Sequence, residues 1–244
     1  MGINTENVKA LRMKIELYES SNVKGYVELV DSMGSDLTPV NAARVSFGVQ
    51  KDSLDDKDKK LIKYLLKHQH TSPFEHNVLT FKFKVPLFVA RQHMRHRTWS
   101  YNEISRRYTK VDINFYSPSS FRTQHKTNRQ ASNEDFVDPV LNVVQGTTAN
   151  WETTASSAVQ RHIENSLKLY NSMLDSGISK EQARMVLPQN LYTTYIGSVN
   201  LNNLIKFINL RDHEGAQQEI REVAQACLKI AQTKWPQIMA HYER

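Results

Sequence analysis

The sequence contains a single cysteine, Cys227, among 244 residues. One thiol cannot form a disulfide within the chain, and it excludes a zinc site built on several cysteines. Glycine is also scarce, with eight residues, and no G-x-G-x-x-G pattern follows a predicted strand. A nucleotide-binding domain of the Rossmann type is therefore not expected.

Long apolar runs are missing as well. No stretch of 18 apolar residues occurs, so we expect no membrane span. The first residues, MGINTENVKALRMK, lack the apolar region of a signal peptide. We therefore expect a cytoplasmic protein, or one in the host cytoplasm if the source is viral. The formal net charge is +7, which favours anionic partners such as nucleic acid, membrane surfaces or phosphorylated small molecules.

The hydrophobic pattern mixes helices and strands. Apolar and polar residues alternate most regularly at 77–85, which predicts a strand with one buried face. Further strands are expected at 13–19 and 191–199. Helices are expected at 37–45, 55–69, 87–97, 150–175, 179–187, 201–210 and 216–240. These elements do not follow a regular βαβ order, so we predict a single α+β domain over 1–244, with the polar stretch 117–149 as a loop or insertion.

The segment 91–108, RQHMRHRTWSYNEISRRY, is the densest in arginine. Aromatic residues lie between these bases, and three interpretations are open. The segment could be a solvated basic edge, a groove for single-stranded nucleic acid, or a pocket for a small phosphorylated ligand. Asn102, Glu103 and Ser105 favour the third interpretation, because a carboxylate can hold ribose hydroxyls or ring N–H groups but adds nothing to phosphate tracking.

This segment resembles the signature of flavin-dependent thymidylate synthases. Arg95-His96-Arg97, seven further residues and then Ser105 reproduce the pattern RHR-x7-S. The segments 42–47, 68–76, 183–193 and 199–211 are similar to other segments of that family, so the resemblance covers most of the chain.

The resemblance implies a mixed or antiparallel sheet flanked by helices, and a homotetramer whose active sites are shared between subunits. It implies a methyltransferase that converts dUMP to dTMP, with methylenetetrahydrofolate as one-carbon donor and FAD reduced by NADPH. It implies no nucleic-acid or membrane partner. The alternative is a single-stranded nucleic-acid-binding protein using 91–108, and a flavin absorbance spectrum would separate the two.

The resemblance also implies roles for individual residues. Those expected to bind dUMP are Gln92, His93, Met94, Arg95, Glu103, Ile104, Ser105, Arg106, Arg107, Arg184 and Arg211. Those expected to bind FAD are His70, Ser72, Arg95, His96, Arg97, Glu103, Asn200, Leu201 and Asn202. The chain departs from the family pattern at Lys206 and Gly215, so no role is expected for Lys206 or for the nearby His213.

The chemistry of the remaining candidates supports this reading. Cys227 shares an apolar helical face with Ile220 and Val223, so we expect a buried structural thiol rather than a nucleophile. The planar guanidinium of Arg211 is then the natural group to stabilise an ionised uracil at N3 and O4, as the catalytic residue. We expect Ser105 to donate or accept hydrogen bonds, and we expect no metal site.

Overall fold

The computed structural model describes residues 13–145 and 149–242. The expectation that no signal peptide is present concerns residues that lie mostly outside these ranges. None of the described helices is both long and apolar enough to cross a membrane.

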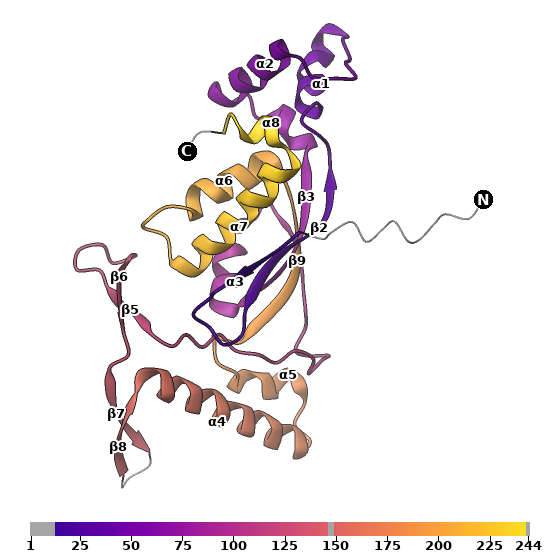
Figure 1. Ribbon diagram of the computed structural model, residues 1–244. Coiled ribbons are helices and arrows are strands. Elements are labelled where there is room, and N and C mark those ends of the chain that lie inside the picture. Colours follow the sequence, from indigo (N-terminus) through magenta and orange to yellow (C-terminus); the bar gives the residue numbers. More distant parts are fainter. Residues whose placement is uncertain (1–12, 146–148, 243–244) are drawn as a thin grey trace.

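A five-stranded sheet forms the centre of the molecule (Figure 1). Its order is β1-β2-β3-β9-β4, and every neighbouring pair is antiparallel. The strands are β1 (Lys14–Leu17), β2 (Gly25–Met33), β3 (Val78–Pro86), β4 (Ser100–Glu103) and β9 (Tyr192–Asn200). The predicted α+β class, with a sheet flanked by helices, is confirmed.

The central strands β3 and β9 contribute many of the buried side chains of the core. Leu79, Phe81, Phe83 and Val85 of β3 are each fully buried, as their alternation predicts. Phe83 lies opposite Tyr195 of β9 in the register, and their rings stack with centroids 4.9 Å apart. Two strands of this sheet were not predicted: β2 is half polar and bulged near Leu29, and β4 is only four residues long.

Helices flank the sheet and complete its core. Those covering it are α1 (Thr38–Arg44), α2 (Asp56–Lys67), α3 (Leu87–His93), α6 (Leu201–Arg211), α7 (Gln218–Lys234) and α8 (Pro236–Met239). The predicted helix 87–97 stops at His93, after which the chain turns before β4. The predicted helix 216–240 is interrupted at Trp235, because Pro236 fits only at the start of a new helix.

The stretch 117–149, predicted as a loop or insertion, contains regular strands. It contains β5 (Phe121–Gln124), β6 (Ser132–Val137) and β7 (Val140–Gln145), and β8 (Ala149–Thr154) begins at its end. β5 pairs with β6 and β7 pairs with β8, so the stretch forms two hairpins. The valines of β7 favour a strand, but the polar composition around them concealed this pattern.

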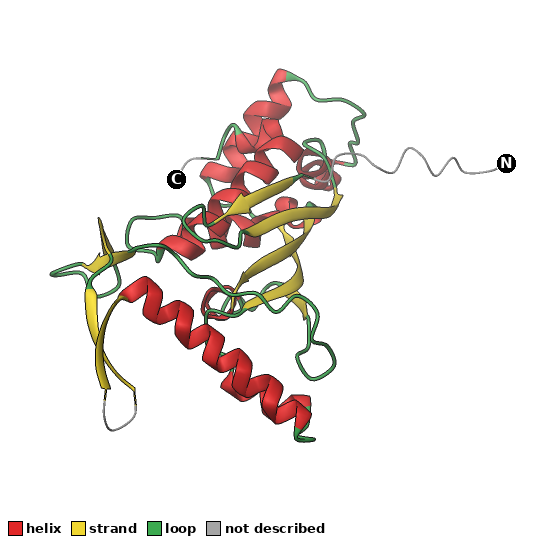
Figure 2. Ribbon diagram, turned by 60° about the horizontal axis from the view of Figure 1, so that its bottom comes forward, coloured by secondary structure: helices red, strands yellow, loops and turns green. Residues whose placement is uncertain are grey.

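The helix expected from residue 150 begins later, because its first residues belong to a strand. Residues 150–154 belong to β8, and the helix α4 (Ala155–Asp175) starts after Thr154, whose side chain caps it by accepting the Ser157 amide. In place of the helix expected at 179–187 the chain has α5 (Lys180–Ala183) and the 3-10 turn η4 (Arg184–Val186). Figures 1 and 2 show α4 and the hairpins extending away from the sheet.

Candidate functional site

Arg211, at the C-terminal end of α6, is held by acceptors near the end of α3. Its Nε donates to His96 Nε2 at 3.0 Å, and its Nη2 donates to the backbone oxygen of Gln92 at 3.2 Å. Burial, and to a smaller extent the positive charge of Arg211, lower the pKa of His96 to about 4. The imidazole is therefore neutral at pH 7 and can accept the hydrogen bond from Arg211.

Positive charge is concentrated around this contact. Burial lowers the pKa of Arg211, and the nearby positive charge of Arg95 lowers it too. Arg95 and Arg97 are exposed, and within residues 13–145 and 149–242 neither forms an ion pair with a carboxylate. Guanidinium groups that lack carboxylate partners are suited to an anionic ligand.

The structure places His93 in the core rather than on the surface. Its side chain is fully buried, and Nδ1 lies 2.7 Å from the Tyr195 hydroxyl. The rings of Phe83, Trp99 and Phe207 surround it. Burial holds the pKa of His93 well below its usual value, so the ring is neutral. This imidazole supports the fold of the segment 91–108 and has no exposed face for a nucleotide.

A second group of predicted residues lies at and after the end of β4. Glu103 accepts a hydrogen bond from Thr193 Oγ1 at 2.5 Å, which fixes its carboxylate against β9. Arg107 pairs with Glu181 at 3.3 Å, and Arg184 Nε donates to the Glu181 backbone oxygen at 3.2 Å. Glu181 thereby brings Arg107 and Arg184 together from segments far apart in the sequence.

Arg106 is buried and bonded differently from its neighbours. Its guanidinium donates to the backbone oxygens of Val111 (2.5 Å), Asp112 (2.9 Å) and Tyr192 (3.3 Å). These bonds tie the loop after β4 to β9. Although the family resemblance placed Arg106 at dUMP, its side chain here serves the backbone. The Ser105 Oγ accepts the Arg107 amide at 3.2 Å, and no His or Asp among the described residues is bonded to it.

A third group lies at the N-terminal end of α6. Asn200 caps the helix by accepting the Asn203 amide at 2.9 Å, and Asn202 donates to Glu75 at 2.9 Å. Glu75 belongs to the 3-10 turn η3 (Ser72–His76), which follows the exposed His70. A cavity of about 620 Å³ adjoins this group, and Lys206 lines it.

The first and third groups are not contiguous within one chain. Asn202 and Arg211 stand near opposite ends of α6, which has 11 residues. At 1.5 Å per residue the helix is about 16 Å long. The predicted FAD residues therefore divide between the start of α6 and the Arg95–Arg97 segment.

Predictions on buried side chains are confirmed. Cys227 is fully buried, and burial raises the pKa of its thiol well above the usual value. Tyr192 and Tyr195 of β9 also lie in the core. Among the described residues, no three His, Cys, Asp or Glu side chains are grouped as a metal site would need.

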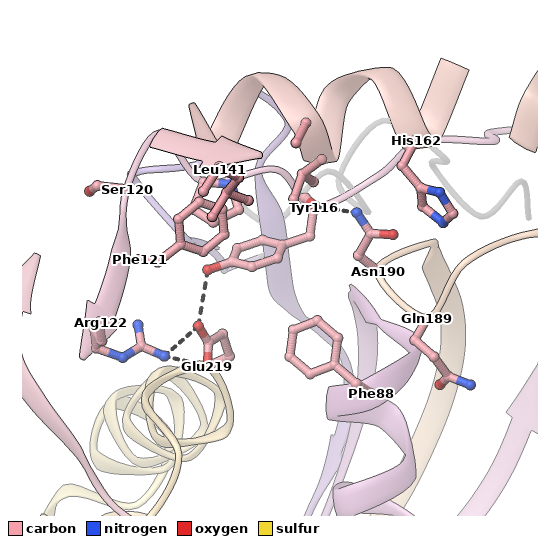
Figure 3. A pocket seen from close by; sticks show the side chains of 14 residues that line it. Phe88, Tyr116, Ser120, Phe121, Arg122, Leu141, His162, Gln189, Asn190 and Glu219 are labelled. Carbon is pink, nitrogen blue, oxygen red and sulfur yellow. Dashed lines mark hydrogen bonds and ion pairs between the residues drawn. The ribbon is translucent and has the colours of Figure 1, made fainter. Parts of the chain in front are cut away.

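Sequence reasoning missed a polar cluster beside this site. Glu219, at the start of α7, accepts bonds from Arg122 Nη2 at 2.7 and 2.9 Å and from the Tyr116 hydroxyl at 3.0 Å (Figure 3). The cluster borders a cavity of about 610 Å³ lined also by Phe88 and Phe121. A carboxylate among the apolar positions of α7 was the available signal, but its partner lies 97 residues away.

Comparison with known proteins identifies the family to which the chain is similar. The family model described as thymidylate synthase complementing protein matches residues 28–237. The flavin-dependent thymidylate synthase of Thermus thermophilus is 42% identical over 220 residues, which cover 90% of this chain and 76% of that protein. The enzyme of the same name from Thermotoga neapolitana is 42% identical over 214 residues, 87% of this chain and 88% of that protein.

Solved structures give the same result. Two crystal structures of the UMP/dUMP methylase PolB from Streptomyces cacaoi, bound with 5-Br UMP and with 5-Br dUMP, are 34% identical to this chain. Their TM-scores are 0.72 and 0.74, and the matches cover 89% of this chain and 92% and 94% of those chains. The nucleic-acid-binding interpretation receives no support from these comparisons. This chain belongs to the flavin-dependent thymidylate synthases, a family of methyltransferases that use FAD, a folate methyl donor and NADPH.

Proposed function

We propose that this chain converts dUMP to dTMP by reductive methylation, with methylenetetrahydrofolate as one-carbon donor and NADPH as the reductant of FAD. The observation that carries the proposal is the contact between Arg211 and the neutral His96, close to the positive charge of Arg95. This contact fixes a guanidinium fork next to a second positive charge, which has no carboxylate partner among the described residues. The uracil nucleotides bound to the related methylase PolB support dUMP as the substrate.

The donor set fits FAD, which carries a diphosphate and a polar ring system. Arg95 and Arg97 offer cationic donors, Asn200 and Asn202 at the start of α6 carry side-chain amides, and Ser72 in η3 carries a hydroxyl. The residues that would hold FAD are His70, Ser72, Arg95, His96, Arg97, Glu103, Asn200, Leu201 and Asn202. When bound, FAD supplies the hydride for the reduction.

The dUMP site would combine the first two groups. Arg107, Arg184 and Ser105 would bind the nucleotide, together with Gln92, Met94, Arg95, Glu103 and Ile104. Arg211 would stabilise negative charge on the uracil ring, because its fork can meet two ring atoms at once. For His93 and Arg106 the buried geometry favours a supporting role instead.

The chain's own chemistry explains why no thiol is needed. Cys227 is fully buried in α7, so it cannot reach C6 of the uracil ring. Electrostatic activation by Arg211 then replaces covalent activation.

Separation of the predicted FAD residues along α6 supports a homotetramer whose subunits complete one another's sites. We place the enzyme in the cytoplasm, or in the host cytoplasm for a viral source.

A titration with FAD tests this proposal. The purified chain should absorb in the flavin bands or quench FAD fluorescence at one equivalent per subunit. Arg95→Ala should weaken FAD binding, whereas Arg129→Ala, at an exposed site between β5 and β6, should not. A folded, colourless chain that does not quench FAD fluorescence would contradict the proposal and revive the nucleic-acid-binding alternative.

A further inference from the structure

Glu219 has an unusual setting for a carboxylate in this chain. It is 4% exposed, yet four hydrogen bonds from three residues reach it: two from Arg122, one from Tyr116 and one from Gln217 Nε2 at 2.8 Å. Burial raises the pKa of Glu219, but the bonds and charge of Arg122 and the bond from Gln217 outweigh this effect, so the pKa lies below its usual value. The group is an ionised carboxylate at neutral pH.

The carboxylate of Glu219 fixes the orientation of the Gln92 amide through Gln217. A carboxylate only accepts hydrogen bonds, so Gln217 must turn its NH2 group toward Glu219. Its amide oxygen then faces Gln92 and accepts from Gln92 Nε2. With its NH2 group engaged in this way, Gln92 keeps its amide oxygen without a hydrogen-bond partner within residues 13–145 and 149–242.

The relay ends beside the candidate catalytic residue. The backbone oxygen of Gln92 accepts the bond from Arg211 Nη2 at 3.2 Å, and His96, four residues along, accepts the bond from Arg211 Nε. The amide of Gln92 therefore belongs to the same segment that positions Arg211. The direction of that amide decides whether this part of the site offers an acceptor or a donor.

We infer that Glu219 and Gln217 are positioning residues that orient the Gln92 amide, so that its oxygen accepts a hydrogen bond from an N–H or O–H group of the bound nucleotide. This inference rests on the proposed function. Before its ring is ionised, dUMP offers two donors, the uracil N3–H and the sugar 3′-hydroxyl, whereas phosphate oxygens are acceptors and would face a like dipole. The Gln92 oxygen therefore binds the nucleoside part of the substrate rather than its phosphate.

Gln217→Met tests the relay with little disturbance of the fold. The side chain keeps a similar length, and Glu219 keeps its bonds to Arg122 and Tyr116. We expect the Kd of dUMP, measured by calorimetry on the FAD-loaded enzyme, to rise about tenfold, which corresponds to about 1.4 kcal/mol. FAD affinity and melting temperature should stay unchanged. Gln218→Met, at the next position, is the matched control and should bind dUMP normally.

The outcomes separate the relay from the proposed function. If wild-type enzyme binds dUMP and Gln217→Met binds it within twofold of wild type, the relay is refuted while the proposed function stands. If wild-type enzyme with bound FAD does not bind dUMP, the proposed function fails and the relay fails with it.

Substrate analogues provide a second measurement. N3-methyl-dUMP lacks the ring donor, and 2′,3′-dideoxyuridine monophosphate lacks the 3′-hydroxyl. For the analogue that lacks the donor bound by Gln92, the tenfold effect of Gln217→Met should disappear, because the two changes remove the same interaction. An undiminished effect with both analogues would overturn the inference.

Discussion

Arg211 donates from two nitrogens of its guanidinium, from Nε to an imidazole nitrogen and from Nη2 to a backbone oxygen. A residue that only complemented the C-terminal dipole of α6 would need neither acceptor, since charge alone serves that purpose. The two directed bonds fix the plane of the guanidinium. The remaining N–H groups can then meet a planar ligand in a defined orientation.

Arg211→Lys conserves the charge but removes this geometry, and we expect it to lower the rate of dTMP formation by the FAD-loaded enzyme. Loss of one charged hydrogen bond costs about 1.5–3 kcal/mol. At 1.36 kcal/mol per decade, this corresponds to a decrease of roughly 10- to 150-fold. Arg129→Lys, at an exposed position, is the control and should have the wild-type rate. Near-normal turnover in Arg211→Lys would leave uracil activation without an assigned residue.

Cys227→Ala addresses the buried thiol. Because burial raises the pKa of this group and no solvent reaches it, we expect dTMP formation to continue in the variant. The free energy of unfolding should fall by about 1 kcal/mol, as for a small truncation in a core. Cys227→Ser should destabilise the chain more, since it buries a hydroxyl group. A stable, FAD-bound Cys227→Ala chain without turnover would identify a nucleophilic thiol.

At the level of single residues, the sequence identified candidate site residues, but it did not predict which groups each side chain contacts. The motif RHR-x7-S identified Arg95, His96 and Ser105 as candidates. It could not distinguish the exposed Arg107 from the buried Arg106, because both fall in one basic run. That difference depends on backbone oxygens of Val111 and Tyr192, whose positions follow from the tertiary fold.

Among the elements, those with a strong local period were predicted correctly. β3 and β9 bury alternate residues, and α2 is a capped amphipathic helix whose first turn carries acidic residues. β4 and the hairpins in 117–149 were missed. Their short, polar strands gain stability from cross-strand partners rather than from a local pattern. Such pairing cannot be read from one segment alone.

Arg106→Lys tests the connection between β4 and β9. A lysine ammonium cannot reproduce the fork that reaches three backbone oxygens, so we expect the free energy of unfolding to fall by about 2 kcal/mol in urea denaturation. Arg107→Lys should change it by less than about 1 kcal/mol, because the Arg107–Glu181 pair is exposed. Equal effects of the two substitutions would show that Arg106 is not a structural anchor.

For the molecule as a whole, the arrangement of candidate residues has a consequence for assembly. The groups at the two ends of α6 stand about 16 Å apart in one chain. An active site shared between subunits would draw one group from each of two neighbouring chains. The sequence suggested this only through family resemblance, since no local pattern encodes a subunit contact.

Mixing two inactive variants tests the shared site. Arg95→Ala and Arg184→Ala chains, each folded and inactive alone, should recover part of the dTMP-forming activity when unfolded and refolded together. Hybrid assemblies then contain some sites with both arginines intact. Light scattering should give a mass of four subunits. A fully active monomer would contradict the shared-site arrangement.

The most direct test of the central claim is dTMP formation from dUMP by the purified chain. The assay contains methylenetetrahydrofolate and NADPH and is run with and without FAD. We predict that dTMP accumulates over many turnovers and that removal of FAD abolishes its formation. A folded chain that makes no dTMP with FAD, or makes it equally well without FAD, would contradict the account.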